Sequence, residues 1–304
     1  MPLLFILLVA IWSTGFITGK FIVGLIDPNV YLAIRFTLAG AIFWLLAIVF
    51  KRPFPPRSDW PKHIIAGSLL NAFYLSLAYI ALAQGLPAGV MALIGSMQPI
   101  LVTLLALVLI KEKTSLFGVL GMLIAIAGLL LVISPSLQHS ETTESFSVWL
   151  AIIGLGGVIS LALGSIYQKM SISGSDIIAS MALQNLSAAV ISGGFMLALQ
   201  ESLFVHNLTA YALVAWGVIV LSCGGVFLLV WLLRKIPASQ VSTLMLLVPP
   251  LAAIEGYFLF DEALSRLQLM GVVTTLVGVY LSRVKWGSGK QPAPADEDGA
   301  EQQG

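Results

Sequence analysis

The chain has 304 residues, of which 59% are hydrophobic and 10% are charged, and its mean hydropathy is +1.00. Soluble proteins carry about 25% charged residues, so this composition excludes an ordinary soluble domain and indicates that lipid surrounds most of the chain. The net charge of +1 argues against a nucleic-acid partner, and the single cysteine, Cys223, excludes an internal disulfide.

Ten apolar stretches are long enough to cross a bilayer, because a spanning helix needs about 20 mostly apolar residues. In chain order they are Pro2–Phe21, Asn29–Phe50, His63–Ala83, Ala88–Ile110, Leu116–Ile133, Val148–Tyr167, Ser175–Leu199, Thr209–Leu233, Ala238–Phe260 and Leu267–Val284. Backbone polar groups within lipid must be paired inside the segment, so each stretch predicts a helix.

The loops between these stretches differ sharply in positive charge. If the N-terminus is cytoplasmic, twelve lysines and arginines fall in inner segments, and only Lys20 and Arg266 fall in outer ones. Cytoplasmic loops are enriched in these residues, so we expect both termini to face the cytoplasm of a bacterial cell, with the chain in its inner membrane.

The second half of the chain repeats the first at a nearly constant offset. The offset is 149 for Gly15/Gly164, Lys20/Lys169 and Asp27/Asp176, and 150 for Pro87/Pro237, Pro99/Pro249, Gly121/Gly271 and Gly128/Gly278. Each copy holds five stretches, and an odd number inverts the second copy in the membrane. The prediction is an all-α membrane protein of ten transmembrane helices built from two inverted five-helix repeats, residues 2–134 and 148–284. An outer linker at 135–147 joins them, and a disordered cytoplasmic tail follows at 285–304.

Several of these residues resemble a known family, the drug/metabolite transporter superfamily of the type with two EamA domains. The first stretch reads Ala10-Ile11-Trp12-Ser13-Thr14-Gly15-Phe16, which is similar to that family's Trp-Gly-Ser-Asn-Phe opening, although Ser13 and Gly15 replace its glycine and asparagine. Each half then closes as EamA domains do, with Gln98-Pro99, Glu112, Gly121 and Gly128, and with Pro249-Pro250, Glu262, Gly271 and Gly278. The resemblance implies carrier-mediated transport of small organic solutes, commonly export.

Pro99 and Pro249 each lie 11 residues into their predicted helices, about 16 Å deep at 1.5 Å per residue. A proline there removes a backbone donor, and paired kinks near the midplane suit a solute cavity between repeats. Packing kinks without solute contact are the alternative. Pro250 has Ile100 as its counterpart, so the second kink differs from the first.

Arg35 and Glu255 are the charges well inside the predicted spans. An ionisable group at that depth is costly and by default a functional candidate. The two lie at similar depths, which permits an ion pair, a gate or a contact with solute charge, and Glu255 could also carry a proton. A static structural pair, or snorkelling to the interface, is the alternative.

Polar and aromatic residues within the spans complete a candidate cavity. They are Trp12, Asn71, Tyr74, Tyr79, Gln98, Tyr167, Gln184 and Asn185, with Glu255. Unpaired amides are costly in hydrocarbon, so we expect Asn71 and Asn185 to face the protein interior. Hydrogen bonds between helices are the alternative role for several of these residues.

The glycine pairs Gly121/Gly128 and Gly271/Gly278 are seven residues apart and so share one helix face. Small residues let membrane helices approach closely, which predicts either a rigid scaffold or the interface of a homo-oligomer.

Catalytic and cofactor motifs are lacking. His63, His139 and His206 fall at interfaces or in loops, and the sequence contains no paired-aspartate protease pattern, metal-ligand cluster or Walker A loop. We therefore expect no enzyme activity, no metal and no cofactor.

The hypothesis is a secondary-active carrier that exports a small organic metabolite or drug by alternating access, with a proton or another ion as candidate coupling ion. A non-transporting membrane scaffold or assembly factor is the alternative.

Overall fold

A computed structural model describes residues 2–84, 86, 91, 94–95, 97–111, 116–138, 148–172, 174–248, 250–251, 255 and 266–283. These residues form helices joined by short turns, and among them the only β-type pairing is one bridge between Ile26 and Phe204. Pro249, Glu112, Glu262, the 139–147 part of the linker and the tail from 284 lie outside the described residues.

Most helices of the first half follow the predicted stretches closely. They are α1 (Pro2–Ile22), α2 (Pro28–Val49), the short η1 (Arg57–Asp59), α3 (Trp60–Gly67), the π-helical η2 (Ser68–Phe73), α4 (Tyr74–Ala83), α6 (Gln98–Leu109) and α7 (Leu116–Gln138). Segments η1 to α4 run on without interruption, so they occupy the third predicted stretch.

The second half has the same order. Its helices are α8 (Val148–Ser171), α9 (Ile177–Ala198), α10 (Leu208–Trp216), the π-helical η4 (Gly217–Val226), α11 (Phe227–Lys235), α12 (Ala238–Met245) and α14 (Arg266–Arg283). Among the residues that the structure describes, five continuous helical segments are long and apolar enough to cross a membrane: 28–49, 57–83, 148–171, 177–198 and 208–235. Shorter apolar helices within α1, α6, α7 and α14 accompany them.

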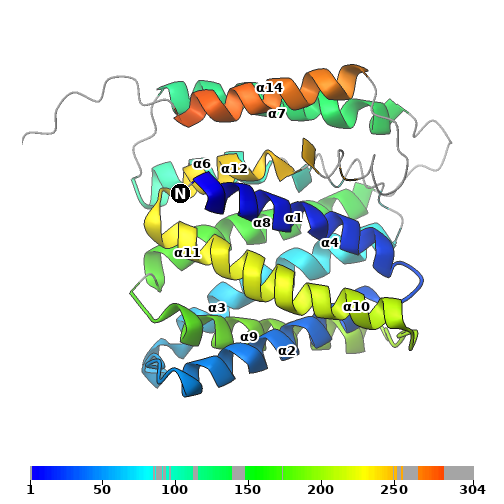
Figure 1. The fold of residues 1–304 in the computed structure, drawn as a ribbon, viewed down its shortest axis with the longest axis vertical. Coiled ribbons are helices and arrows are strands. Elements are labelled where there is room, and N and C mark those ends of the chain that lie inside the picture. The colour runs from blue at the N-terminus through cyan, green and yellow to red at the C-terminus, as the bar shows by residue number, and fades with distance from the viewer. Residues whose placement is uncertain are drawn as a thin grey trace, which may run out of the picture.

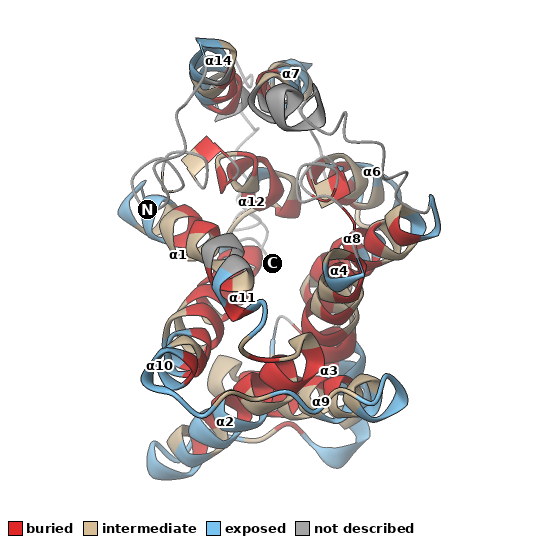
Figure 2. Cartoon of the chain, turned by 90° about the vertical axis from the view of Figure 1, so that its right-hand side faces the viewer, coloured by how far each residue is buried: buried red, intermediate tan, exposed pale blue. Residues whose placement is uncertain are grey.

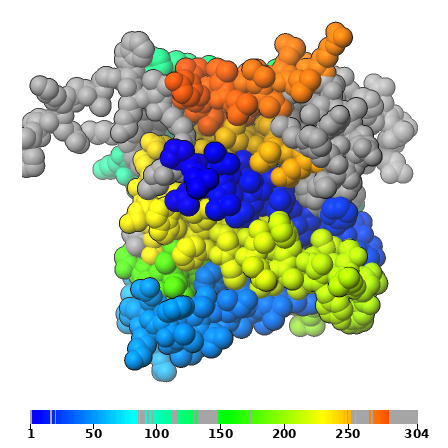
Figure 3. All heavy atoms as spheres, in the orientation of Figure 1, coloured from blue at the N-terminus to red at the C-terminus, as the bar shows by residue number. Residues whose placement is uncertain are grey.

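Two closely packed helix pairs lie at opposite ends of the molecule, α7 with α14 and α2 with α9 (Figure 1). Helices α1, α10 and α11 line one side between these pairs, and α8, α3 and α4 line the other (Figure 2). In the space-filling view the atoms of α1, α10 and α11 lie side by side on one face (Figure 3). Figure 2 shows buried residues on the inward faces of most helices and exposed residues on the outer faces.

Glycine residues allow α7 and α14 to pack closely. A Cβ atom on Gly128 would lie 2.4 Å from the Thr275 backbone nitrogen, and one on Gly278 would lie 2.3 Å from the Ala125 nitrogen. Backbone therefore meets backbone in both directions, which requires glycine at both positions and shows that the two helices are antiparallel. The glycine faces predicted from sequence thus pack against each other within one chain.

The pair α2–α9 is tied at both ends. At one end the Asp27 carboxylate accepts hydrogen bonds from the backbone of Ser202 (2.9 Å) and Leu203 (2.8 Å), and the Asn29 side chain donates to Glu201 (2.8 Å). At the other end Arg52 lies 4.0 Å from Asp176. The two helices are therefore also antiparallel, and the backbone bonds make the Asp27 end the better connected.

Equivalent positions in the two halves share local structure. Helices α2 and α9 both end with a residue in the left-handed region, Lys51 (φ 49°) and Gln200 (φ 57°), which are 149 residues apart. The following amides, of Arg52 and Glu201, donate five residues back to Ala47 and Met196, the bond that closes a Schellman motif. The π-helical segments η2 and η4 begin 149 residues apart.

The fourth and ninth stretches are interrupted at matching points, and this changes the interpretation of Pro99. Helix α6 begins at Gln98 after a turn at Met97, whereas the sequence predicted one kinked helix over 88–110. Pro99 therefore lies in a first helical turn, where its missing N–H leaves no bond unmade. In the second half α12 ends at Met245, and a turn follows at Leu246 and Leu247, the latter 150 residues after Met97.

Candidate functional site

Trp12 and Tyr74, both predicted cavity residues, are brought together by α1 and α4. The Trp12 indole lies within interaction range of the Tyr74 phenol, and both side chains are partly buried. Tyr74 follows directly after η2, so the π-helical segment sets which way its ring points. Residues of η4 also pack against the indole, since a Cβ on Gly225 would lie 3.8 Å from Trp12.

Arg35 lies on α2 and reaches the other π-helical segment. Its Nε donates a 2.8 Å hydrogen bond to the Ser222 hydroxyl of η4, and its guanidinium also interacts with the Tyr31 phenol. The side chain is only 4% exposed, and no carboxylate among the described residues pairs with it. Gly217 makes room for this arrangement, because a Cβ there would lie 2.1 Å from the Tyr31 hydroxyl oxygen.

Glu255 lies beside α1. One carboxylate oxygen accepts a 2.6 Å hydrogen bond from the Ser13 hydroxyl, and the other is buried with no partner among the described side chains. Ser13 is itself fully buried and adjoins Trp12 in sequence. The glutamate thus contacts α1 at the residue that follows Trp12 in sequence.

Arg35 and Glu255 do not form the ion pair that their similar depth permits. Each has its own hydroxyl partner in this conformation, Ser222 for Arg35 and Ser13 for Glu255. We call Trp12, Ser13, Arg35, Tyr74, Ser222 and Glu255 the α1 cluster. It combines one cation, one acid and two aromatic rings from both halves of the chain.

The remaining predicted cavity residues lie elsewhere. Gln98 is buried and its amide approaches Ser242 of α12 at 3.4 Å. Gln184 donates to Gln168 of α8 at 3.0 Å, and Asn185 donates to the Met181 carbonyl of its own helix at 2.9 Å. As expected, Asn71 and Asn185 face the interior, with exposures of 1% and 0%.

Tyr167 and the prolines do not join the α1 cluster. Tyr167 interacts electrostatically with Lys62 near the end of α8, close to the edge of the helical region. Tyr79, by contrast, lies near Gly19 and interacts with Arg35. Pro99 and Pro250 are both buried, at the interruptions described above.

Sequence reasoning missed the hydroxyl partners Ser13 and Ser222 and both π-helical segments. A serine in a membrane helix is common, and nothing local distinguishes one that faces a charge. The repeat could have drawn attention to Ser222, because its counterpart Phe73 adjoins Tyr74. The described residues contain no group of three or more His, Cys, Asp or Glu side chains placed to hold a metal ion.

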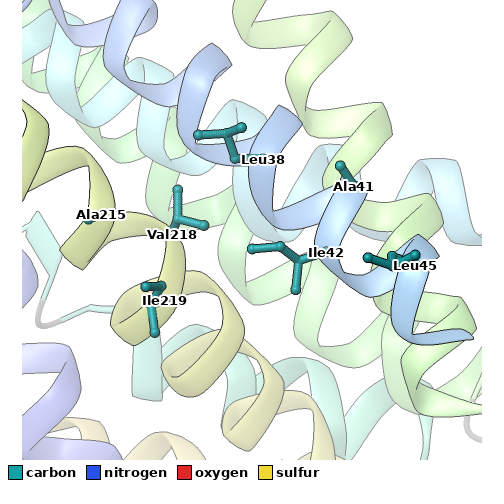
Figure 4. A pocket seen from close by; sticks show the side chains of 7 residues that line it. All are labelled: Leu38, Ala41, Ile42, Leu45, Ala215, Val218 and Ile219. Carbon is teal, nitrogen blue, oxygen red and sulfur yellow. The ribbon is translucent and has the colours of Figure 1, made fainter. Parts of the chain in front are cut away.

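An apolar groove lies on the outer surface between α2 and η4 (Figure 4). It has a volume of about 390 Å³ and is lined by Leu38, Ala41, Ile42, Leu45, Ala215, Val218 and Ile219. None of these side chains can hydrogen-bond, so the groove suits lipid chains and offers nothing to orient a polar solute.

Comparison with known proteins identifies the family. The model of the EamA-like transporter family matches residues 1–134 and 148–284. The chain belongs to the EamA-like transporter family. It is therefore an integral multi-pass membrane transporter, and its cargo is a small-molecule solute. EamA relatives are transporters and not enzymes, in agreement with the sequence-based expectation.

Individual EamA relatives align over most of the chain. A WAT1-related chloroplast protein of Arabidopsis thaliana is 28% identical, covering 89% of this chain and 66% of its own length. An uncharacterized transporter of Bacillus subtilis is 24% identical, covering 93% and 91%. A probable amino-acid metabolite efflux pump of Escherichia coli K12 is 26% identical, covering 91% and 92%. A solved crystal structure covers 92% of this chain and 96% of its own, with a TM-score of 0.77 and 17% identity, and so shares the fold.

Proposed function

We propose that the protein is a secondary-active carrier that exports a small organic solute by alternating access. The observation that carries this proposal is the α1 cluster. In it Arg35 has no carboxylate partner and lies near Tyr74, and Glu255 has one unpaired oxygen and accepts a bond from Ser13, the neighbour of Trp12 in sequence. Buried charges are costly in a membrane, and a solute with complementary charges would satisfy both of them.

Ten crossings in two inverted five-helix repeats are the architecture we propose. The antiparallel pairs α7–α14 and α2–α9 support it, because each joins equivalent helices of the two halves. The domains are then residues 2–134 and 148–284, joined outside the cell by 135–147. Basic residues at the Arg52 and Arg234 ends support a cytoplasmic location for both termini, in a bacterial inner membrane. A proton or another ion is the proposed coupling ion.

The proposed solute is a zwitterion of amino-acid type. A guanidinium suits a carboxylate, a glutamate suits an ammonium group, and the aromatic rings offer an apolar side-chain contact. The Escherichia coli relative is named as a probable amino-acid metabolite efflux pump, which makes amino acids and their derivatives the first panel to test.

Counterflow in proteoliposomes tests transport directly. We expect vesicles loaded with unlabelled solute to accumulate radiolabelled amino acid transiently for at least one member of the panel, because a carrier exchanges bound solute without net energy input. Protein-free vesicles are the control. Absence of exchange across the whole panel of amino acids and N-acetylated derivatives would favour the scaffold alternative.

Glu255→Gln tests the proposed ammonium contact. The amide keeps the shape of the side chain and can still accept from Ser13, but it lacks the charge. We expect exchange of solutes with a free ammonium group to fall about tenfold, equivalent to roughly 1.4 kcal/mol, while N-acetylated analogues are unaffected. Ser13→Ala, which keeps the charge and removes the hydrogen bond, is the control. An equal loss for both solute classes contradicts the contact.

A further inference from the structure

Unpaired buried polar atoms gather in one sector of the molecule. Among the described residues, nine buried side-chain nitrogen or oxygen atoms have no hydrogen-bond partner, and seven of them lie on α3, η2, α8, α9 and α11. The seven are His63 Nδ1 and Nε2, Asn71 Nδ2, Gln168 Nε2, Gln184 Oε1, Asn185 Oδ1 and Arg234 Nε. The sequence analysis placed His63 at the membrane interface or in a loop, but in the structure its side chain is completely buried.

The residues that carry these atoms extend from one end of the helices towards the middle. Arg234 lies at the end, where its guanidinium donates to the carbonyls of Ser175 and Ile172 and to the Ser180 hydroxyl. His63 lies within electrostatic range of Arg234, and Asp59 and Lys62 are the other charges near it.

The inner part of the series consists of amide side chains. Gln168 and Gln184 share one hydrogen bond, and Asn71 lies further along, on η2. Helices α3 and η2 pack against both α8 and α9 throughout.

Leaving these groups unpaired is expensive. Each costs about 1–3 kcal/mol when it loses water without gaining a partner, and native proteins pair nearly all such groups. Water cannot reach any of the seven atoms in this conformation. A conformation in which the helices part and water enters recovers this cost.

The corresponding sector of the other half lacks this lining. At the offset of 149, His63 corresponds to Ala212, Asn71 to Val220, Gln168 to Gly19 and Asn185 to Phe36, and among these residues and Gln184 only Gln184 has a polar counterpart, in Arg35. At these positions the polar residues thus belong to the sector that ends at Arg52 and Arg234, whereas the other half has Arg35 and Ser222 in the α1 cluster. Packing alone does not account for that asymmetry, because the apolar counterparts fill equivalent positions.

We propose that the junction of α3 and η2 with α8 and α9 is the cytoplasmic access path, closed in this structure and hydrated when these helices separate. Opening exposes His63, Gln168 and Gln184 to cytoplasmic water and leads towards the α1 cluster. This inference rests on the proposed alternating access. Hydration of the polar residues that line the path would stabilise the inward-open state.

Cysteine accessibility tests the path. Because Cys223 is the single cysteine, Cys223→Ser provides a background in which one new thiol reports alone. Gln184→Cys is placed in the path, and Ala182→Cys, equally buried on the same helix but packed in an apolar cluster, is the matched control. The probe is the membrane-impermeant sulfonatoethyl methanethiosulfonate.

We expect the thiol at position 184 to react at least about tenfold faster than that at 182 in inside-out vesicles, a difference of roughly 1.4 kcal/mol in access. It should react slowly in right-side-out vesicles. Equal rates at the two positions, or faster reaction from the outside, overturn the path.

Histidine exchange provides a second measurement on the unsubstituted protein, independent of whether the cysteine variants fold. The imidazole C2 proton exchanges with deuterated water only where water reaches the ring. In proteoliposomes we expect His63 to exchange within about tenfold of the exposed His206, since local opening exposes it repeatedly. Exchange of His63 more than about a hundredfold slower than that of His206 shows a permanently dry site and overturns the proposal.

The two proposals fail separately. Counterflow without labelling at position 184 and without His63 exchange leaves the carrier intact and rejects this path. Labelling and exchange without counterflow across the solute panel support a hydrated path and reject the proposed transport.

Discussion

Replacing Gly128 with leucine is expected to separate α7 from α14 and to lower the melting temperature by about 5 °C or more. A Cβ at this position would lie 2.4 Å from the Thr275 backbone nitrogen and 2.7 Å from the Gly271 carbonyl oxygen. Backbone atoms in the middle of a helix cannot move aside as a flexible side chain can. Overpacking of this kind costs about 1–3 kcal/mol or more, and in a chain of this size each kcal/mol shifts the melting temperature by about 2–4 °C.

Gly193→Leu is the matched control for this prediction. Gly193 is also in the middle of a helix, α9, but nothing lies within 4 Å of its virtual Cβ. Gly278→Leu should behave like Gly128→Leu, because its Cβ would meet the Ala125 backbone. Thermal unfolding of the three variants in detergent is monitored by size-exclusion chromatography, which gives the melting temperature of each. An unchanged melting temperature for Gly128→Leu would show that the two helices are not packed as described.

Arg35→Gln is expected to reduce counterflow of zwitterionic solutes by about tenfold or more. The change removes the buried positive charge that we propose binds the solute carboxylate, and the loss of one charge-assisted hydrogen bond is worth about 1.5–3 kcal/mol. Arg35→Lys should give an intermediate result, because lysine keeps the charge but cannot present a guanidinium fork held by Ser222.

Arg52→Gln is the control for arginine removal. Its side chain is 51% exposed and lies 4.0 Å from Asp176, and an exposed pair contributes at most about 1 kcal/mol. Counterflow per folded molecule separates a solute contact from a structural role. If Arg35→Gln lowers the amount of folded protein while flux per folded molecule stays constant, Arg35 is a structural residue and the proposed carboxylate contact is wrong.

Helix positions were the part of the fold most accessible from sequence. Helices α1, α2, α8, α9 and α14 begin and end within a few residues of the predicted stretches, because an apolar run long enough to span lipid has to be helical whatever surrounds it. At Pro99 the sequence predicted a kink within one helix, and in the structure α6 begins at Gln98 after a turn at Met97. A proline is compatible with both outcomes, so the local sequence could not decide between them.

The π-helical segments illustrate a different limit. Hydrogen bonds in η2 and η4 span five residues instead of four, which alters the direction of side chains in and after them. Tyr74 follows η2 directly, and Ser222 lies within η4. No residue pattern announces such a bulge, because its stability comes from packing against other helices. The candidate site was therefore only partly accessible: Trp12, Arg35, Tyr74 and Glu255 were predicted, and their hydroxyl partners were not.

The sequence alone determined that lipid surrounds the protein and which residues form its apolar helices. It also determined that the two halves repeat at an offset of 149–150 residues and which family the chain belongs to. These properties follow from sums over local windows and from residue identity. Only the tertiary structure decided that Arg35 and Glu255 take separate partners, that the glycines of α7 and α14 face each other, and that His63 is buried. Such pairings depend on the rotation and crossing of helices distant in sequence, which no local window contains.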